Sequence, residues 1–256
     1  MQPGEVVLVT IATTGPAEVV KVRAFDADQR PFIVDSHTWK VLVGIDLDAK
    51  PGPYTVTVDA TMAGKAEHAT KQLVVTAKQF PTRTLKVDEA FVNPPASVTA
   101  RIEEESKLLA ATWAKSAAAP LWTGAFARPV AEPANSAFGS RSVFNGQARS
   151  PHAGADFLSP AGTPVKAPAA GRVVVARDLY YSGGTVIIDH GLGLFSFFAH
   201  LSAISVHEGD EVKTGDLLGK VGATGRVTGA HLHWAVRLNG TRVDPLSLLA
   251  VMGPAR

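Results

Sequence analysis

Three separated segments of the chain carry imidazole and carboxylate side chains at spacings that suit a metal-dependent hydrolase. His231 and His233 lie two residues apart in a strand-like run, and side chains at positions i and i+2 of a β-strand point to the same face. Upstream, His152 and Asp156 add one imidazole and one carboxylate, and His200 lies in another strand-like run. These groups exceed the ligands that one zinc ion needs and are typical of a zinc site that also performs hydrolysis.

The chemistry of such a set divides into metal binding and proton transfer. A catalytic zinc site commonly has three protein ligands and a water, so two imidazoles and the carboxylate of Asp156 would complete it. Two histidines then remain, and they suit a general base and a stabiliser of the transition state, because imidazole titrates near working pH. The count alone leaves open which histidines take which role.

The composition limits the class of protein that positions these residues. The 256 residues are 46% hydrophobic, which suffices for two modest cores, and we expect two domains. The 25 basic and 23 acidic residues nearly balance and form no basic patch, so we expect no nucleic-acid partner. The absence of cysteine excludes disulfides and thiolate ligands. We expect no transmembrane segment, and the start of the sequence lacks the features of a signal peptide.

Residues 1–78 have the pattern of a small all-β module. Short runs of alternating apolar residues are separated by turn-forming clusters such as the Pro-Gly-Pro at 51–53. Roughly seven such runs predict an immunoglobulin-like β-sandwich. No catalytic set is visible here, and His37 and His68 are interpreted as surface or turn residues rather than ligands.

Residues 79–135 are predicted to be a connector with one helix. An extended segment leads to Ser97, which is placed to cap a helix over about 97–117. The apolar stripe of that helix comprises Val98, Ile102, Leu109 and Trp113. The acidic run at 103–105 is interpreted as a solvated helix face with a favourable dipole interaction, in preference to a metal or partner site.

Residues 136–256 are predicted to form a β-rich, barrel-like domain with negligible helix. Strand-like runs occupy residues 173–175, 185–188, 194–198 and 231–236, and Asn239-Gly240 is a strong hairpin signal. His190 is interpreted as a turn or packing residue and His207 as a solvent-exposed one. The fold class of the whole chain is therefore expected to be mainly β.

The three segments resemble the lysostaphin-type, LytM-like zinc endopeptidases, which cut peptide bonds in bacterial peptidoglycan. The H-x-x-x-D of that family is present as His152 and Asp156, its H-x-H as His231 and His233, and its aromatic-x-His-Leu as residues 198–201. The match covers about residues 136–248 in family order. As a set these motifs are far more specific than any one of them alone.

The resemblance implies a role for each of the five residues. His152, Asp156 and His233 would bind Zn²⁺, and His200 and His231 would be the catalytic histidines. Hydroxide delivered by the zinc would attack the peptide bond with acid and base assistance from those histidines. Position 198 is Phe where the family often has Tyr, which would loosen the site if that hydroxyl orients a group behind the ligands.

The resemblance also implies a substrate and a location. The substrate would be a cross-link or stem peptide of peptidoglycan, and the protein would act outside the cytoplasm, as a periplasmic, secreted or wall-associated protein. We expect a monomer. The N-terminal half resembles, more weakly, accessory regions that precede the peptidase domain in some members. Two other interpretations remain open: a catalytically silent wall-binding or hydrolase-activating scaffold, and a zinc peptidase that acts on protein substrates.

Overall fold

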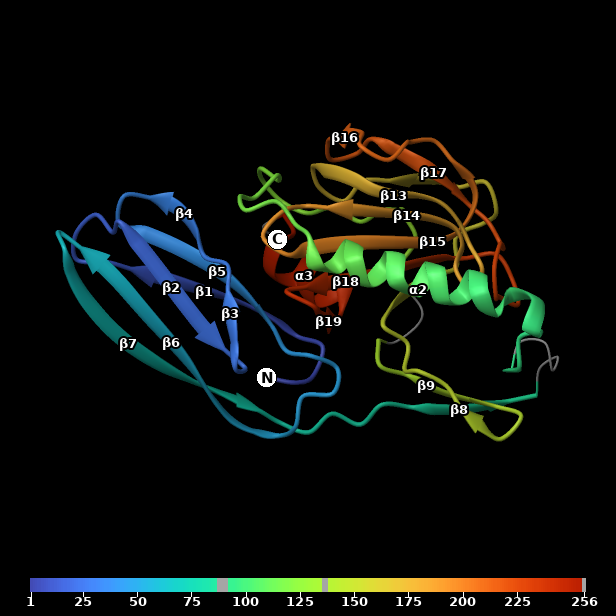
Figure 1. Ribbon diagram of the computed structural model, residues 1–256, viewed down its shortest axis with the longest axis horizontal. Coiled ribbons are helices and arrows are strands. Elements are labelled where there is room, and N and C mark those ends of the chain that lie inside the picture. Colours follow the sequence, from blue (N-terminus) through green and yellow to red (C-terminus); the bar gives the residue numbers. More distant parts are fainter. Residues whose placement is uncertain (87–91, 135–137, 255–256) are drawn as a thin grey trace.

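The computed structural model describes residues 1–86, 92–134 and 138–254, and strands dominate it. Figure 1 shows two strand-rich regions next to each other, one formed by the N-terminal strands and the other by the strands of the second half. The predicted mainly β fold is confirmed. The predicted boundary between residues 135 and 136 lies outside the described residues.

The N-terminal region contains seven strands, as the sequence pattern predicts. They are β1 (Val6–Ala12), β2 (Val19–Ala24), β3 (Ala27–Gln29), β4 (Phe32–Asp35), β5 (Thr38–Gly44), β6 (Gly52–Met62) and β7 (Lys65–Val75). One sheet has the order β1-β5-β4 and a second has the order β3-β2-β6-β7. An aliphatic cluster takes residues from both sheets, while His37 and His68 are exposed as predicted.

Strand β5 contributes to two cores at once. Val41 and Val43 belong to the cluster shared by the two N-terminal sheets, whereas Leu42 belongs to the main core of the molecule. This division follows from the alternation of side chains along a strand. Val6 of β1 joins the same main core. The first N-terminal sheet is therefore covered on both faces.

The connector differs from the sequence-based prediction in its details. Strand β8 (Thr82–Leu85) pairs in parallel with β9 (Arg141–Phe144), which forms a hairpin with β10 (Gln147–Ala148). A 3-10 turn, η1 (Ala96–Val98), precedes helix α2 (Thr99–Ala114), which is shorter than the predicted 97–117. The predicted cap is wrong, because Ser97 lies inside η1 and no side chain caps α2.

Helix α2 packs against one face of the main sheet through an aromatic contact and a hydrogen bond. The ring of Trp113 meets that of Phe195 edge-on, with centroids 5.3 Å apart. The carboxylate of Glu105 accepts a hydrogen bond from the backbone N–H of Tyr180 at 2.8 Å and pairs with Arg101 of its own helix. Glu105 is therefore a structural anchor, so the interpretation of residues 103–105 as a solvated face is wrong for Glu105, whereas Glu103 and Glu104 are exposed as predicted. The acidic run also lies beyond the first turn of α2, so it gains less from the helix dipole than predicted.

The second half of the chain forms a nine-stranded sheet. Its strands are β11 (Gly154–Phe157), β12 (Pro164–Lys166), β13 (Gly171–Leu179), β14 (Gly183–Asp189), β15 (Leu194–Ile204), β16 (Glu211–Val212), β17 (Leu217–Val221), β18 (Leu232–Leu238) and β19 (Thr241–Val243). The main path runs β11-β18-β15-β14-β13-β16. Its two end strands do not pair with each other in the described chain, so the sheet is open and the predicted barrel is not confirmed.

Two features at the end of the chain complete the fold. Asn239 and Gly240 both have positive φ and form the predicted hairpin turn between β18 and β19. A short helix that the sequence did not predict, α3 (Pro245–Met252), follows β19, with the Asp244 side chain accepting a hydrogen bond from Leu246 N. None of the helices in the described residues has the length and apolar character that crossing a membrane requires.

Candidate metal-dependent active site

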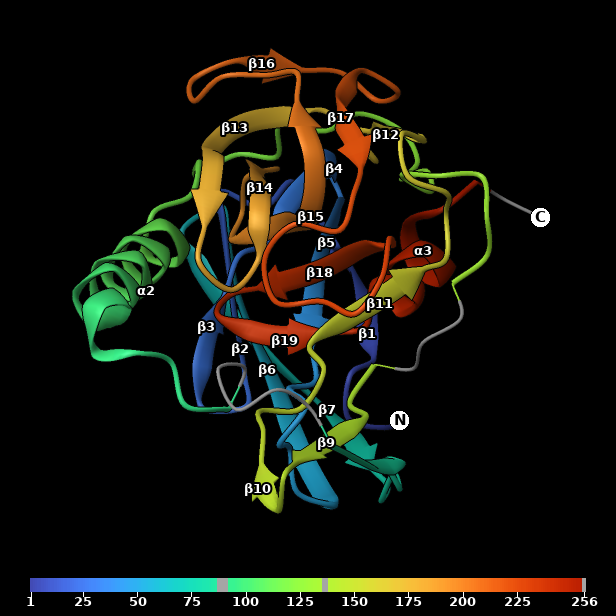
Figure 2. The ribbon, with the colours of Figure 1, turned by 90° about the vertical axis from the view of Figure 1, so that its right-hand side faces the viewer.

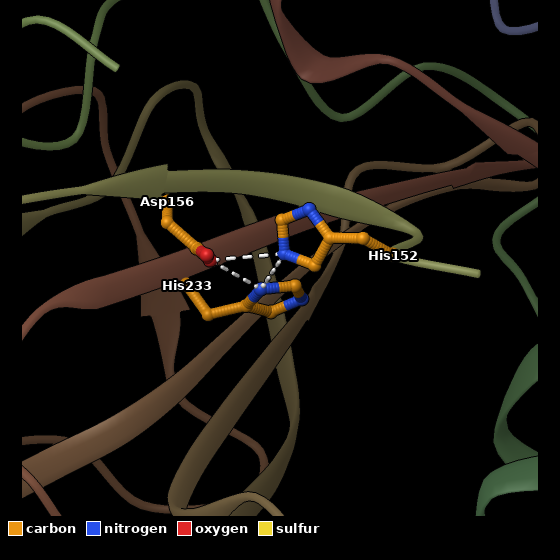
Figure 3. Close-up of side chains that lie close together, drawn as sticks. All are labelled: His152, Asp156 and His233. Atoms are coloured by element: carbon orange, nitrogen blue, oxygen red, sulfur yellow. Dashed lines mark hydrogen bonds and ion pairs between the residues drawn. The ribbon is translucent and has the colours of Figure 1, made fainter. Parts of the chain in front are cut away.

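Three of the five predicted residues meet in one cluster, formed by His152, Asp156 and His233. Asp156 on β11 and His233 on β18 are directly paired across the two antiparallel strands, so their side chains share one face of the sheet. His152 lies just before β11 and turns toward the same point (Figure 3). The distances are 3.0 Å from His152 Nε2 to Asp156 Oδ1, 3.0 Å from His152 Nε2 to His233 Nδ1, and 2.9 Å from His233 Nδ1 to Asp156 Oδ1.

This triangle of atoms fits a bound cation better than a network of hydrogen bonds. Three atoms that all face one point cannot satisfy each other fully, because each hydrogen bond needs one donor and one lone pair. A cation at that point would accept a lone pair from each. Zinc held tetrahedrally at about 2.0–2.1 Å has ligand atoms roughly 3.3 Å apart, close to the spacing found here. The two nitrogens and one oxygen are also ligand types that zinc prefers.

The absence of a side chain at Gly154 gives His233 its place. A Cβ atom built at Gly154 would lie 2.5 Å from the carbonyl oxygen of Trp234 and 2.8 Å from Cε1 of the His233 ring. Real Cβ atoms do not approach other atoms that closely. Glycine at this position therefore lets the His233 ring lie against β11, facing Asp156.

His200 reaches the cluster through an irregularity in strand β15. Its φ is +66°, an uncommon value for a residue other than glycine, and the register between β14 and β15 shifts beside it. The His200 Nδ1–H donates to the carbonyl oxygen of Thr224 at 2.9 Å. Neutral His200 therefore keeps its lone pair on Nε2. Its ring centroid lies 6.0 Å from that of His233.

His231 lies beside His200, at the start of β18. Its Nδ1–H donates to the carbonyl oxygen of Gly229 at 2.9 Å, so its Nε2 also keeps the lone pair when the ring is neutral. The two rings have centroids 4.8 Å apart. His231 Nε2 lies 3.8 Å from Asp156 Oδ1, which places it next to the metal-binding cluster without joining it.

Burial and neighbouring charges shift the protonation of the cluster. Burial raises the pKa of Asp156, but the hydrogen bonds from His152 and His233 outweigh it and hold the pKa below its ordinary value. Burial, reinforced by the charge of His233, lowers the pKa of His200 to about 4. Burial likewise lowers the pKa of His233. Asp156 is therefore an anion near neutral pH, while His200 and His233 are neutral, which are the forms that bind a metal or accept a proton.

All five residues line one groove of about 380 Å³. Its other walls include Tyr181 and Arg226, and the guanidinium of Arg226 lies 4.5 Å from the centroid of the Tyr181 ring. Figure 2 shows α2 to one side of β18 and the β9–β10 hairpin below it. The groove thus lies against β15 and β18, two neighbouring strands in the middle of the sheet.

Comparison with known proteins identifies the family. The model of peptidase family M23 matches residues 150–245. The crystal structure of a putative peptidase M23 from Pseudomonas aeruginosa aligns with a TM-score of 0.73 and 33% sequence identity, covering 98% of this chain and 95% of that chain. This chain belongs to peptidase family M23. The family resemblance inferred from the H-x-x-x-D and H-x-H motifs is confirmed.

Two curated relatives each match a part of this chain. The DD-carboxypeptidase/endopeptidase Mpg of Neisseria meningitidis is 44% identical over 97 residues, which are 38% of this chain and 22% of that protein. The peptidoglycan DD-endopeptidase ShyA of Vibrio cholerae is 43% identical over 96 residues, with the same two shares. The chain therefore spans less than a quarter of the length of these two curated relatives.

His190 and His207 of this M23 chain lie outside the groove and have the structural roles that the sequence predicts. His190 is fully buried, donates through Nδ1 to the carbonyl oxygen of Ala170 and accepts at Nε2 from Ser196, which makes it a packing residue. His207 is exposed. The sequence did not indicate Thr224, whose carbonyl holds His200, or Tyr181, which lines the groove, because only the tertiary fold brings these two loop residues to the site.

Phe198, which replaces the Tyr often found at this position in the family, does not line the groove. Phe198 is fully buried on the opposite face of β15 and stacks on Trp234, with centroids 6.3 Å apart and planes inclined by 5°. A phenolic hydroxyl on that ring would point into the core and away from the metal-binding cluster. The expectation that Phe198 loosens the site therefore finds no support in this M23 fold.

Proposed function

We propose that this M23 chain is a zinc-dependent endopeptidase that hydrolyses peptide bonds in bacterial peptidoglycan. The observation that carries the proposal is the triangle of His152, Asp156 and His233 with the rings of His200 and His231 beside it in an open groove. The activities named for the relatives from Neisseria and Vibrio support peptidoglycan as the substrate. Cross-links and stem peptides are both candidates for the bond that is cut.

In this proposal, three residues hold the metal. His152 contributes Nε2, His233 contributes Nδ1 and Asp156 contributes Oδ1, because these are the atoms that converge. Two neutral imidazoles and one carboxylate leave a net positive site when a divalent cation binds. Zinc suits this donor set and supplies a Lewis acid and a water of lowered pKa.

The other two histidines handle protons. His231 accepts the proton of the attacking water at Nε2, since its Nδ1 is committed to the carbonyl of Gly229. His200 would donate a hydrogen bond to the developing oxyanion from Nε2 once it receives the water's proton from His231, whose ring centroid lies 4.8 Å from its own, because its Nδ1–H is committed to Thr224. Return of a proton to the leaving amine completes the hydrolysis.

The rest of the chain is assigned a supporting role. We interpret residues 1–78 as an immunoglobulin-like module, 79–135 as a connector and 136–256 as the peptidase domain. Two sheets that share one aliphatic cluster support the first assignment. Action on peptidoglycan requires a location outside the cytoplasm, so we propose that the protein works there. We also propose that it is a monomer.

The test is the release of new amino termini from purified peptidoglycan. We expect release by the zinc-loaded protein, loss after chelation and recovery when zinc is restored, and mass analysis of the fragments would identify the bond. His231→Ala should retain zinc but lower the rate by about 100-fold or more. His207→Ala is the matched control, because that side chain is exposed outside the groove. A folded, zinc-loaded protein that releases nothing would contradict the proposal and favour the scaffold interpretation.

A further inference from the structure

The groove continues from the metal-binding cluster toward helix α2. A second hollow of about 190 Å³, here called the α2 pocket, lies between the helix and the open face of β18. Leu109 and Trp113 of α2 form one wall, and Phe197 and His233 line both the α2 pocket and the groove. A peptide lying across the metal-binding cluster therefore has an apolar extension of its binding surface on this side.

The α2 pocket contains a guanidinium without an acidic partner. Arg237 lies on the same face of β18 as His233, stacks on the Trp113 ring at 5.2 Å and donates through Nη1 to the carbonyl oxygen of Gly240. Arg237 takes part in no ion pair within the described part of the chain. The nearby carboxylates of Asp46 and Asp48 both bind Arg242, at 2.7 and 2.6 Å.

We propose that Arg237 binds a carboxylate of the peptide substrate in the α2 pocket. This inference rests on the proposed function and specifies which part of the substrate this end of the groove recognises. A guanidinium presents several N–H donors in one plane and binds a carboxylate through paired hydrogen bonds. The apolar wall formed by Leu109 and Trp113 excludes water from that pair and accommodates the aliphatic part of the ligand.

The spacing along β18 sets the scale of the distance between this carboxylate and the metal-binding cluster. His233 and Arg237 are four residues apart on one strand, so their Cα atoms are separated by about 13 Å. An extended peptide covers that distance in about four residues. Burial and the charge of Arg242 disfavour the positive charge of Arg237 and lower its pKa, yet arginine stays charged in proteins. A bound carboxylate would offset that cost.

A purely structural role for Arg237, as a clamp between Trp113 and the β18–β19 turn, makes a different prediction. The test uses uncross-linked stem peptides from peptidoglycan, either as free acids or with their carboxyls converted to amides, and measures their binding to the full chain by calorimetry. We expect the free acids to bind about 10-fold or more tightly than the amides. Arg237→Gln should remove this preference, and Arg237→Lys should keep part of it.

Controls separate binding from folding. Arg172→Gln removes an exposed arginine of the same sheet and should leave the preference intact. Thermal unfolding of each variant shows whether the fold survives, and the comparison of acid with amide on the unmodified chain needs no variant at all. Equal losses for both peptide forms in Arg237→Gln, a preference that persists in it, or no detectable binding of either form would overturn the inference.

The same preparations distinguish this inference from the proposed function. Protein that binds free acids through Arg237 but cleaves no cross-link would contradict the endopeptidase proposal and leave the α2 pocket as a carboxylate site. Protein that cleaves cross-links while Arg237→Gln changes neither the acid preference nor KM would leave the endopeptidase proposal intact and reject the role of Arg237.

Discussion

The two faces of strand β18 have different surroundings, although their side chains alternate along one short stretch of chain, His231 and the seven residues of the strand. One face packs into the main core and carries Leu232, Trp234, Val236 and Leu238, all at most 2% exposed. The other face carries His231 and His233, which line the groove, and Ala235 and Arg237, which line the α2 pocket. We therefore expect substitutions on the closed face to change stability through the volume they leave in the core. Substitutions on the open face should change binding and activity through the chemical groups they remove.

The largest expected effect is on the open face, at His233. His233→Ala removes one of three converging ligand atoms, so metal affinity should fall by more than the roughly 10–100-fold that loss of a group supporting a metal ligand typically costs. Peptide hydrolysis should fall to background. Metal content after dialysis and amino-group release measure the two effects. The metal-free variant should unfold at nearly the same temperature as the metal-free parent, and strong destabilisation would contradict the comparison.

The next effect is on the closed face, one residue away at Trp234. Trp234→Ala should lower the free energy of unfolding by about 3–5 kcal/mol, because it leaves a cavity beside Phe198. Denaturant unfolding of the metal-free protein measures this loss. Trp234→Phe is the matched control and should cost less, since the indole N–H has no hydrogen-bond partner among the described groups and the stack on Phe198 is retained. Equal costs for both variants would show that volume does not govern this face.

The smallest effect concerns His190, which packs against Phe126 in the main core. Burial lowers the pKa of His190 from 6.5 to about 4, so below pH 6.5 the unfolded chain gains a proton that the folded chain does not. The stabilisation from neutral His190 is therefore complete above about pH 6.5 and is lost as the pH falls toward 4, by roughly 3 kcal/mol in total.

Unfolding free energies measured between pH 7.5 and 4.5 with chelator present would test this dependence. His190→Asn can keep the hydrogen bond to Ala170 and should reduce the pH dependence, leaving the part that His200 and His233 contribute. His207→Asn, which changes an exposed histidine, should leave it unchanged. A slope that stays the same in His190→Asn would mean that other groups account for the pH dependence.

The positions of the site residues were predictable where local spacing determines them. Side chains two residues apart on a strand point to the same face, and His231 and His233 do lie on one face of β18. Alternating apolar runs likewise predicted seven N-terminal strands, and Asn239-Gly240 predicted its hairpin. In each case the signal and the structure involve the same few residues.

The unpredicted features depend on contacts between distant segments. Nothing local indicates that Glu105 accepts a hydrogen bond from Tyr180, or that Arg237 stacks on Trp113. The open sheet, in place of a barrel, depends on which strands pair, and spacing along the chain does not determine that. Helix α3 is a local feature, and the expectation of negligible helix in this half missed it although Asp244 and Pro245 are typical of a helix start.

Strand β5 contributes side chains to two hydrophobic cores, and this limits where the chain can be cut without unfolding it. Leu42 and Val6 insert into the core beneath the groove, and Ser247 of α3 accepts a hydrogen bond from the backbone of Val6. We expect the half that contains the M23 region to be unstable when it is expressed alone, because cutting the chain near residue 79 would expose this apolar surface to water. A fusion or truncation design should therefore keep residues 1–78, or replace the buried surface that they supply.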